Sequence, residues 1–166
     1  MSTLATIHAS MDATMQAFQH VSTIKKDMLD HYGKNAWLRD FRTMGFFVPR
    51  QNGVTSWMLK QIIAEPDSLM FTRFRDHYVS NFDSQGVCDV MVPKTSMLSD
   101  DVKQRLREPF DLSSWIKQKN YRVTPLKLLI IDHSCVVFNN IRINKFYEWL
   151  EQSPGVTADT LILRIN

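Results

Sequence analysis

Hydrophobic residues follow a helical period at the start of the chain. They recur every three or four positions, which places them on one face of a helix. These positions are Met11, Met15, Phe18, Val21, Ile24, Met28 and Tyr32. Gly33 is expected to end the helix, because glycine commonly follows a last helical turn. The pattern predicts an N-terminal amphipathic helical segment over residues 1–33, followed by a core over residues 34–166.

From residue 45 onward, short apolar runs alternate with helical patterns. The expected strands are residues 46–48, 68–72, 86–92, 127–131 and 160–165. The expected helices are residues 55–64, 73–81, 100–107 and 141–152, with Ser99 as the cap of the third. Alternation of this kind predicts an α/β fold, a three-layer sandwich with a mainly parallel sheet between helices. Ligands of such sheets bind beyond the carboxyl ends of the strands, so the loops after residues 48, 131 and 165 are candidate sites.

The first candidate motif is the loop after the expected strand 46–48. It runs through Arg50 to Gly53 and leads into a helix, which is the order of a phosphate-binding loop. In such loops backbone N–H groups and the helix N-terminus hold phosphates, a lysine adds charge, and a Ser or Thr hydroxyl binds Mg²⁺. Gly53 stands at the second glycine position and Thr55 at the hydroxyl position, whereas Val54 stands where the lysine belongs. An ordinary strand–loop–helix turn has the same local pattern.

The second candidate motif is the apolar run over residues 128–131, which ends in Asp132. A buried strand that ends in aspartate is the form of a Walker B strand, whose carboxylate holds Mg²⁺ through water. The active members of one large class place a glutamate next, where it polarises the attacking water. Here the next residue is His133. Because the two motifs occur in the correct order, each after an expected strand, they favour one joint site.

Residues 48–55 (VPRQNGVT) and 128–138 (LLIIDHSCVVF) together resemble the ATPase core of phage terminase large subunits and related P-loop NTPases. The resemblance spans roughly residues 46–166, outside the N-terminal helix. It implies nucleotide binding by Arg50, Gly53, Thr55, Asp132 and Asn166, with Asn166 at the position of a polar sensor residue. It also implies that Thr55 and Asp132 would hold Mg²⁺ if Mg-nucleotide binds, and that strand 160–165 lies between strands 46–48 and 127–131, parallel to both.

The departures from this pattern argue against catalysis. Val54 cannot stabilise charge on the β- and γ-phosphates, and His133 is a poor substitute for a carboxylate beside Mg²⁺. Arg50 is a partial replacement for the missing lysine. We therefore assign no catalytic residue and expect no cofactor, with Mg-ATP as the ligand only if the chain is an active or partner-completed ATPase.

Charge adds a second candidate surface. The 166 residues carry a formal charge of +3, which does not by itself indicate nucleic-acid binding. The basic excess falls between residues 93 and 123, and the candidate nucleic-acid contacts are Lys103, Arg105, Arg107, Lys117 and Lys119. Lys103, Arg105 and Arg107 are expected to form an exposed positive patch, for which an ordinary solvated face is the alternative.

The remaining features exclude several classes of protein. No apolar run approaches the roughly 20 residues that cross a bilayer, and no secretory signal is visible. The 2 cysteines cannot form a disulfide framework, and the 5 histidines show no metal-ligand spacing. We expect a cytoplasmic protein, and the phage resemblance implies a virus-infected bacterial cell.

Three functions remain in competition. The first is a catalytically degenerate, virus-encoded P-loop NTPase-like binding module. Its partner would be a protein bound through the N-terminal helix, or nucleic acid bound through the basic segment. The second is an active or partner-completed ATPase acting on nucleic acid. The third is an unrelated α/β nucleic-acid-binding protein in which the motifs are coincidental.

Overall fold

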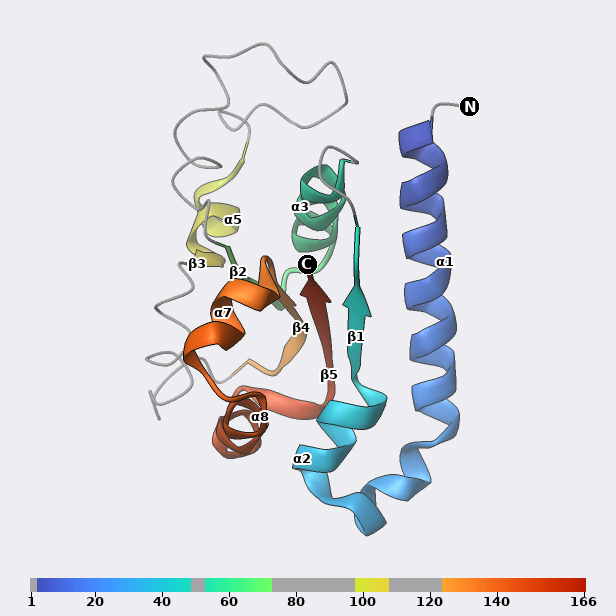
Figure 1. The fold of residues 1–166 in the computed structure, drawn as a ribbon, viewed down its shortest axis with the longest axis vertical. Coiled ribbons are helices and arrows are strands. Elements are labelled where there is room, and N and C mark those ends of the chain that lie inside the picture. Colours follow the sequence, from blue (N-terminus) through green and yellow to red (C-terminus); the bar gives the residue numbers. More distant parts are fainter. Residues whose placement is uncertain (1–2, 49–52, 73–97, 108–123) are drawn as a thin grey trace.

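The computed structural model describes residues 3–48, 53–72, 98–107 and 124–166. Its centre is a five-stranded sheet in the order β1-β5-β4-β2-β3, in which every pair of neighbours is parallel (Figure 1). The strands are β1 (Thr43–Phe46), β2 (Ser68–Phe71), β3 (Leu106–Arg107), β4 (Leu126–Ile131) and β5 (Val156–Ile165). The α/β class and the parallel sheet predicted from the sequence are confirmed.

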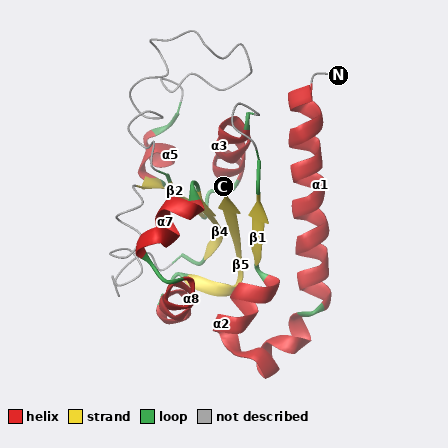
Figure 2. Ribbon diagram, viewed as in Figure 1, coloured by secondary structure: helices red, strands yellow, loops and turns green. Residues whose placement is uncertain are grey.

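Helices cover both faces of this sheet (Figure 2). They are α1 (Thr3–Ile24), α2 (Leu29–Phe41), α3 (Val54–Ala64), α5 (Asp100–Gln104), α7 (Ser134–Asn140) and α8 (Ile143–Gln152), with a 3-10 turn η1 (Lys26–Met28) between the first two. One core lies between the sheet and α1, α3 and α5, and it includes Trp57 and Leu163. The other lies between the sheet and α2, α7 and α8, and it includes Phe146 and Ile162.

The N-terminal helical segment differs from the prediction. Gly33 interrupts the helix as expected, with φ 70° and ψ 159°, but a further helical stretch follows the break and continues to Phe41. The glycine makes this break possible, since L-residues avoid positive φ. Beyond the kink, Trp37 and Leu38 are fully buried. The helical segment is therefore part of the packed structure on both sides of residue 33.

Other boundaries also shift. The first strand lies at Thr43–Phe46 rather than at 46–48, and the helix expected over 100–107 ends at Gln104, after which strand β3 pairs with β2. Ser99 caps that helix as expected, since its Oγ accepts a hydrogen bond from Val102 N at 3.4 Å. The expected helix 141–152 begins at Ile143 and is preceded by α7, which the pattern did not indicate. The expected elements 73–81 and 86–92 lie outside the described residues.

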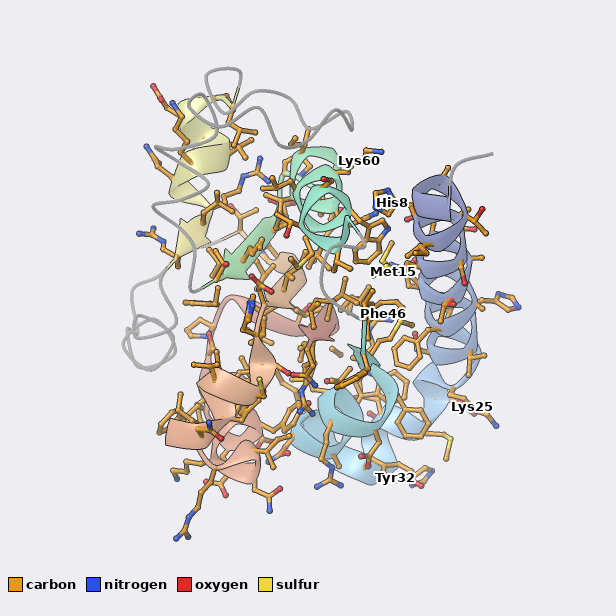
Figure 3. The ribbon with its side chains drawn as sticks, turned by 45° about the horizontal axis from the view of Figure 1, so that its top comes forward. His8, Met15, Lys25, Tyr32, Phe46 and Lys60 are labelled. Atoms are coloured by element: carbon orange, nitrogen blue, oxygen red, sulfur yellow. The ribbon has the colours of Figure 1, made fainter. Side chains whose placement is uncertain are left out.

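Helix α1 packs on α3 through its apolar face and through two side-chain hydrogen bonds to Asp12, which we call the clasp. Met11 is buried in the core, and Met15 and Phe18 pack against it. Asp12 Oδ1 accepts hydrogen bonds from Trp57 Nε1 at 2.7 Å and from Gln61 Nε2 at 3.0 Å. In Figure 3, His8 and Met15 project from α1 toward the rest of the fold. The apolar stripe predicted from the sequence thus faces this chain's own core instead of an outside partner, although Val21 and Tyr32 are exposed.

The clasp gives a direct test of how firmly α1 is held. Replacing Asp12 by Ala leaves the indole N–H of Trp57 and the amide of Gln61 without their acceptor, so Asp12→Ala should lower the free energy of unfolding by about 1–3 kcal/mol. Asp12→Asn keeps an acceptor oxygen and should lose less. Urea unfolding followed by tryptophan fluorescence measures both variants. Equal losses, or none, would mean that packing alone holds the helix.

Candidate functional site

The candidate site lies at the carboxyl edge of the sheet, where the chain leaves the parallel strands. Gly53 begins α3 there in the left-handed region, with φ 64° and ψ 16°. A side-chain contact from α1 reaches this turn, since His8 Nε2 lies 2.8 Å from Gly53 O. Thr55 lies half-buried in the first turn of α3, and Val54 packs against the core. Arg50 lies outside the described residues.

The order of the strands agrees with the expectation from the resemblance. Strand β5 lies between β1 and β4 and is parallel to both, with Phe46 paired to Ile165 and Ile131 paired to Arg164. Because parallel strands end at the same edge, this order brings the loop after β1, Asp132 after β4 and Asn166 after β5 to one side of the sheet. The loop strand and the aspartate strand are therefore separated by one strand.

Asp132 is the best-defined group at this edge. It is buried, with 3% of its surface exposed. Thr72, which follows β2, donates a hydrogen bond from Oγ1 to Asp132 Oδ2 at 2.7 Å, and His133 Nδ1 lies 2.9 Å from Asp132 Oδ1. Both carboxylate oxygens thus face groups of the chain itself. Thr72 was not among the residues singled out from the sequence, because nothing local indicates a contact between residues 60 positions apart.

His133 adopts an unusual backbone conformation. Its φ of 50° and ψ of 49° make it the one non-glycine residue with positive φ among those described. Residues other than glycine carry strain in this region and persist there when their surroundings impose it. The turn starts α7, in which Val136 N donates to His133 O at 2.8 Å. The ring is fixed beside Asp132 and remains one-third exposed.

The residues present do not fit a magnesium ion. A Walker B carboxylate has to be open to the water shell of the metal, whereas Asp132 is buried between Thr72 and His133. Mg²⁺ also demands near-octahedral oxygen ligation, and a histidine beside the single carboxylate adds no oxygen. Within the described residues, no group of three or more His, Cys, Asp or Glu side chains could hold a metal. Asp132 is therefore not assigned to a metal, and the role of Thr55 at the start of α3 stays a prediction.

Asn166 is held by α7. Its Oδ1 accepts hydrogen bonds from Ser134 Oγ and from Cys135 N, the latter at 2.9 Å. Its backbone extends the pairing of β5 with the first strand, because Asn166 N donates to Phe46 O at 3.0 Å and Val48 N donates to Asn166 O at 3.4 Å. The side chain of Asn166 thus anchors the start of α7.

The exposed positive patch predicted around residue 105 is wrong for its central member. Arg105 is buried, with 4% of its surface exposed. Its Nη1 donates to Ile62 O, Glu65 O and Ser68 Oγ at 2.5, 2.7 and 2.9 Å, and its Nη2 lies 3.1 Å from Asp101 Oδ2. These are carbonyl and hydroxyl acceptors at the end of α3 and the start of β2, so the guanidinium serves the fold.

Of the other four basic candidates, the structure describes Lys103 and Arg107. Lys103 is half-buried and pairs with Asp100 at 3.3 Å, and Arg107 is also half-buried. Lys117 and Lys119 lie outside the described residues. A nucleic-acid surface over residues 93–123 therefore remains a prediction that excludes Arg105.

Comparison with known proteins identifies no relative of this chain. No protein-family model, curated protein or solved structure matches the chain. In the part of the chain that is described, no helix is long and apolar enough to cross a membrane.

The contact between Thr72 and Asp132 can be measured as a coupling energy. Thr72→Val keeps the shape of the side chain but leaves Asp132 Oδ2 without its donor, which should lower the free energy of unfolding by about 1–3 kcal/mol. In an Asp132→Ala background the same change should cost much less, because the partner is already absent. Denaturant unfolding of the four proteins gives the cycle, and additive losses would contradict the contact.

The role of Arg105 gives a second test. Arg105→Ala removes the donor for three buried acceptors and should lower the free energy of unfolding by about 3 kcal/mol. Lys103→Ala, a matched loss of charge in a more exposed pair, should change it by less than about 0.5 kcal/mol. Thermal unfolding measures both variants. If Arg105 were a surface charge, the two substitutions would lower the free energy of unfolding by equal, small amounts.

Proposed function

We propose that this chain is a catalytically degenerate P-loop NTPase-like protein that binds a ligand at the carboxyl edge of its sheet without hydrolysing it. The observation that carries the proposal is the strand order β1-β5-β4, with a glycine-led helix after β1 and a buried aspartate after β4. This order supports the joint site that the two motifs predict from the sequence. The ligand to test first is a nucleotide, whose phosphates suit the N–H groups at the start of α3.

The lack of hydrolysis follows from charge. A phosphate-binding loop needs a fixed cation where charge moves onto the γ-phosphate, and Val54 supplies none. Backbone N–H groups alone contribute only partial charges. Hydrolysis also needs a carboxylate beside the attacking water. At that position the chain has His133, whose ring lies against Asp132. Both losses weaken turnover more than they weaken binding, so a binding module is the function that the residues support best.

The proposed partner of such a module is a protein or a nucleic acid. Docking on the apolar stripe of α1 would require that helix to leave the core, because Met11 and Asp12 already contact it. This makes the remaining basic residues of 93–123, or the outward polar face of α1, the better surfaces. The phage origin suggested by the resemblance belongs to the same proposal.

Restoring the lysine tests the phosphate-binding role. Val54→Lys should give Mg²⁺-independent binding of ATP or a clear gain in affinity over the wild type, because it adds a charge at the start of α3. The matched control is Ile63→Lys, which adds the same charge to an exposed position near the end of that helix. Isothermal titration calorimetry measures the affinity of each variant for ATP. None of the variants, and not the wild type, should release phosphate from ATP.

The outcomes separate the competing functions. Equal binding by both lysine variants would reflect added charge alone and contradict a phosphate-binding loop. Absence of binding in Val54→Lys would favour an unrelated α/β nucleic-acid-binding protein. ATP turnover by the wild type above background would instead favour the active or partner-completed ATPase.

A further inference from the structure

At this edge of the sheet, one aromatic side chain, that of Phe47, lies outside the hydrophobic core. Phe47 has 87% of its surface exposed, more than any other large hydrophobic residue in the described part of the chain. Its two neighbours, Phe46 and Val48, both pack against the core on the α3 side. Their backbones are pinned to Asn166 by hydrogen bonds. Because side chains alternate along an extended strand, Phe47 is directed to the opposite face and cannot turn inward with them.

Among the described residues, that opposite face is uncovered along the second half of β1. Thr43, at the start of the strand, is covered by Tyr147, whose hydroxyl donates to Thr43 Oγ1 at 3.0 Å. Two residues later, Gly45 is exposed, and a Cβ built there would meet nothing within 4 Å. In Figure 1 no helix is drawn across the upper parts of β1 and β5. The floor beside Phe47 is therefore open backbone.

Strand β5 adds polar groups to the same strip. Arg164 is the register partner of Gly45, and its guanidinium carbon lies 4.8 Å from the ring centroid of Phe138. Its Nε is buried without a hydrogen-bond partner among the described residues. Asn166 follows next on this face, and its Oδ1 is already used by α7. Its Nδ2, which can donate two hydrogen bonds, has no acceptor among the described residues. We call Gly45, Phe47, Arg164 and Asn166 the open strip.

We propose that the open strip binds the base of a nucleotide, which stacks on Phe47 and accepts a hydrogen bond from Asn166. This inference rests on the proposed function, because the phosphates would lie at the start of α3, which begins seven residues after Phe47 in the sequence. Stacking suits every base, since each has a π-face.

The chemistry of the strip favours a base over a protein partner. A stable protein interface buries about 800 Å² on each side, whereas one aromatic side chain contributes roughly 150–250 Å². Phe47 is the single large apolar side chain of the strip, and its neighbours there are a glycine, an arginine and an asparagine. A flat ring with polar edges matches this composition, because one face stacks while the edge meets hydrogen-bond donors.

The test compares a ligand that has a base with one that lacks it. We expect Phe47→Ala to weaken ATP binding by about ten-fold while leaving the binding of inorganic tripolyphosphate unchanged. Phe47→Tyr keeps the ring and should retain wild-type affinity for ATP. Ile63→Ala, which removes an exposed apolar side chain on α3, should change neither ligand. Titration calorimetry is run in the wild type and in a Val54→Lys background, where added charge should bring both ligands into range.

The remaining outcomes overturn the inference in distinguishable ways. If both ligands bind and Phe47→Ala leaves ATP unchanged, or weakens both equally, the ring does not read a base although the proposed function stands. If binding of a single-stranded oligonucleotide depends on Phe47 and binding of ATP does not, the strip binds nucleic acid, and the proposal of a mononucleotide ligand is wrong. If neither ligand binds in either background, the proposed function fails and takes this inference with it.

Discussion

The pairing of β5 on both of its edges is the constraint on which the rest of the structure depends. This strand is hydrogen-bonded to β1 on one side and to β4 on the other, so it joins the loop strand to the aspartate strand. Its side chains serve both cores, with Leu163 in one and Ile162 in the other. Because β5 is the last strand in the sequence, β1 has no strand partner in the described sheet until the chain has been followed to residue 156. Such long-range parallel pairing makes folding slow, since loop closure precedes the contacts that reward it.

Two buried guanidinium groups stabilise opposite edges of this sheet, and both donate hydrogen bonds to backbone carbonyls. Arg105 joins the end of α3 to β2 through the carbonyls of Ile62 and Glu65. At the other edge Arg42, which directly precedes β1, donates to Ser22 Oγ at 2.6 Å and to the carbonyls of Asp159 and Thr160. Burial lowers the pKa of Arg42, partly offset by the charge of Asp159. An arginine remains charged even so, and its several donors suit places where a helix end and a strand start meet.

Local pattern was sufficient where an element buries a regular face. The strands at residues 68–71 and 126–131 and the helix α3 are close to their predicted bounds, because apolar period and breaker residues both mark them. Pattern failed where long-range contact decides. Gly33 interrupts the helix as its chemistry predicts, but the local pattern did not predict the second helical stretch beyond it, in which Trp37 is buried. Strand β3 has only two residues and exists through pairing with β2, and Arg105 looks like a surface charge until its acceptors, about 40 residues away, are known.

The candidate site shows the same division. The sequence predicts Asp132 at a strand end and Gly53 at a helix start, and the sheet brings both to one edge. It does not predict that Thr72 and His133 take up the carboxylate, because these contacts join β2 to a strained turn after β4. A buried carboxylate needs donors whether or not it binds a metal, since an unpaired charge in the interior is very costly. Thr72 and His133 therefore give Asp132 a structural role, because their contacts join the ends of β2 and β4. At this edge the carboxylate of Asp132 is enclosed by its own neighbours, whereas Gly45 and Phe47 of the first strand and its continuation are exposed.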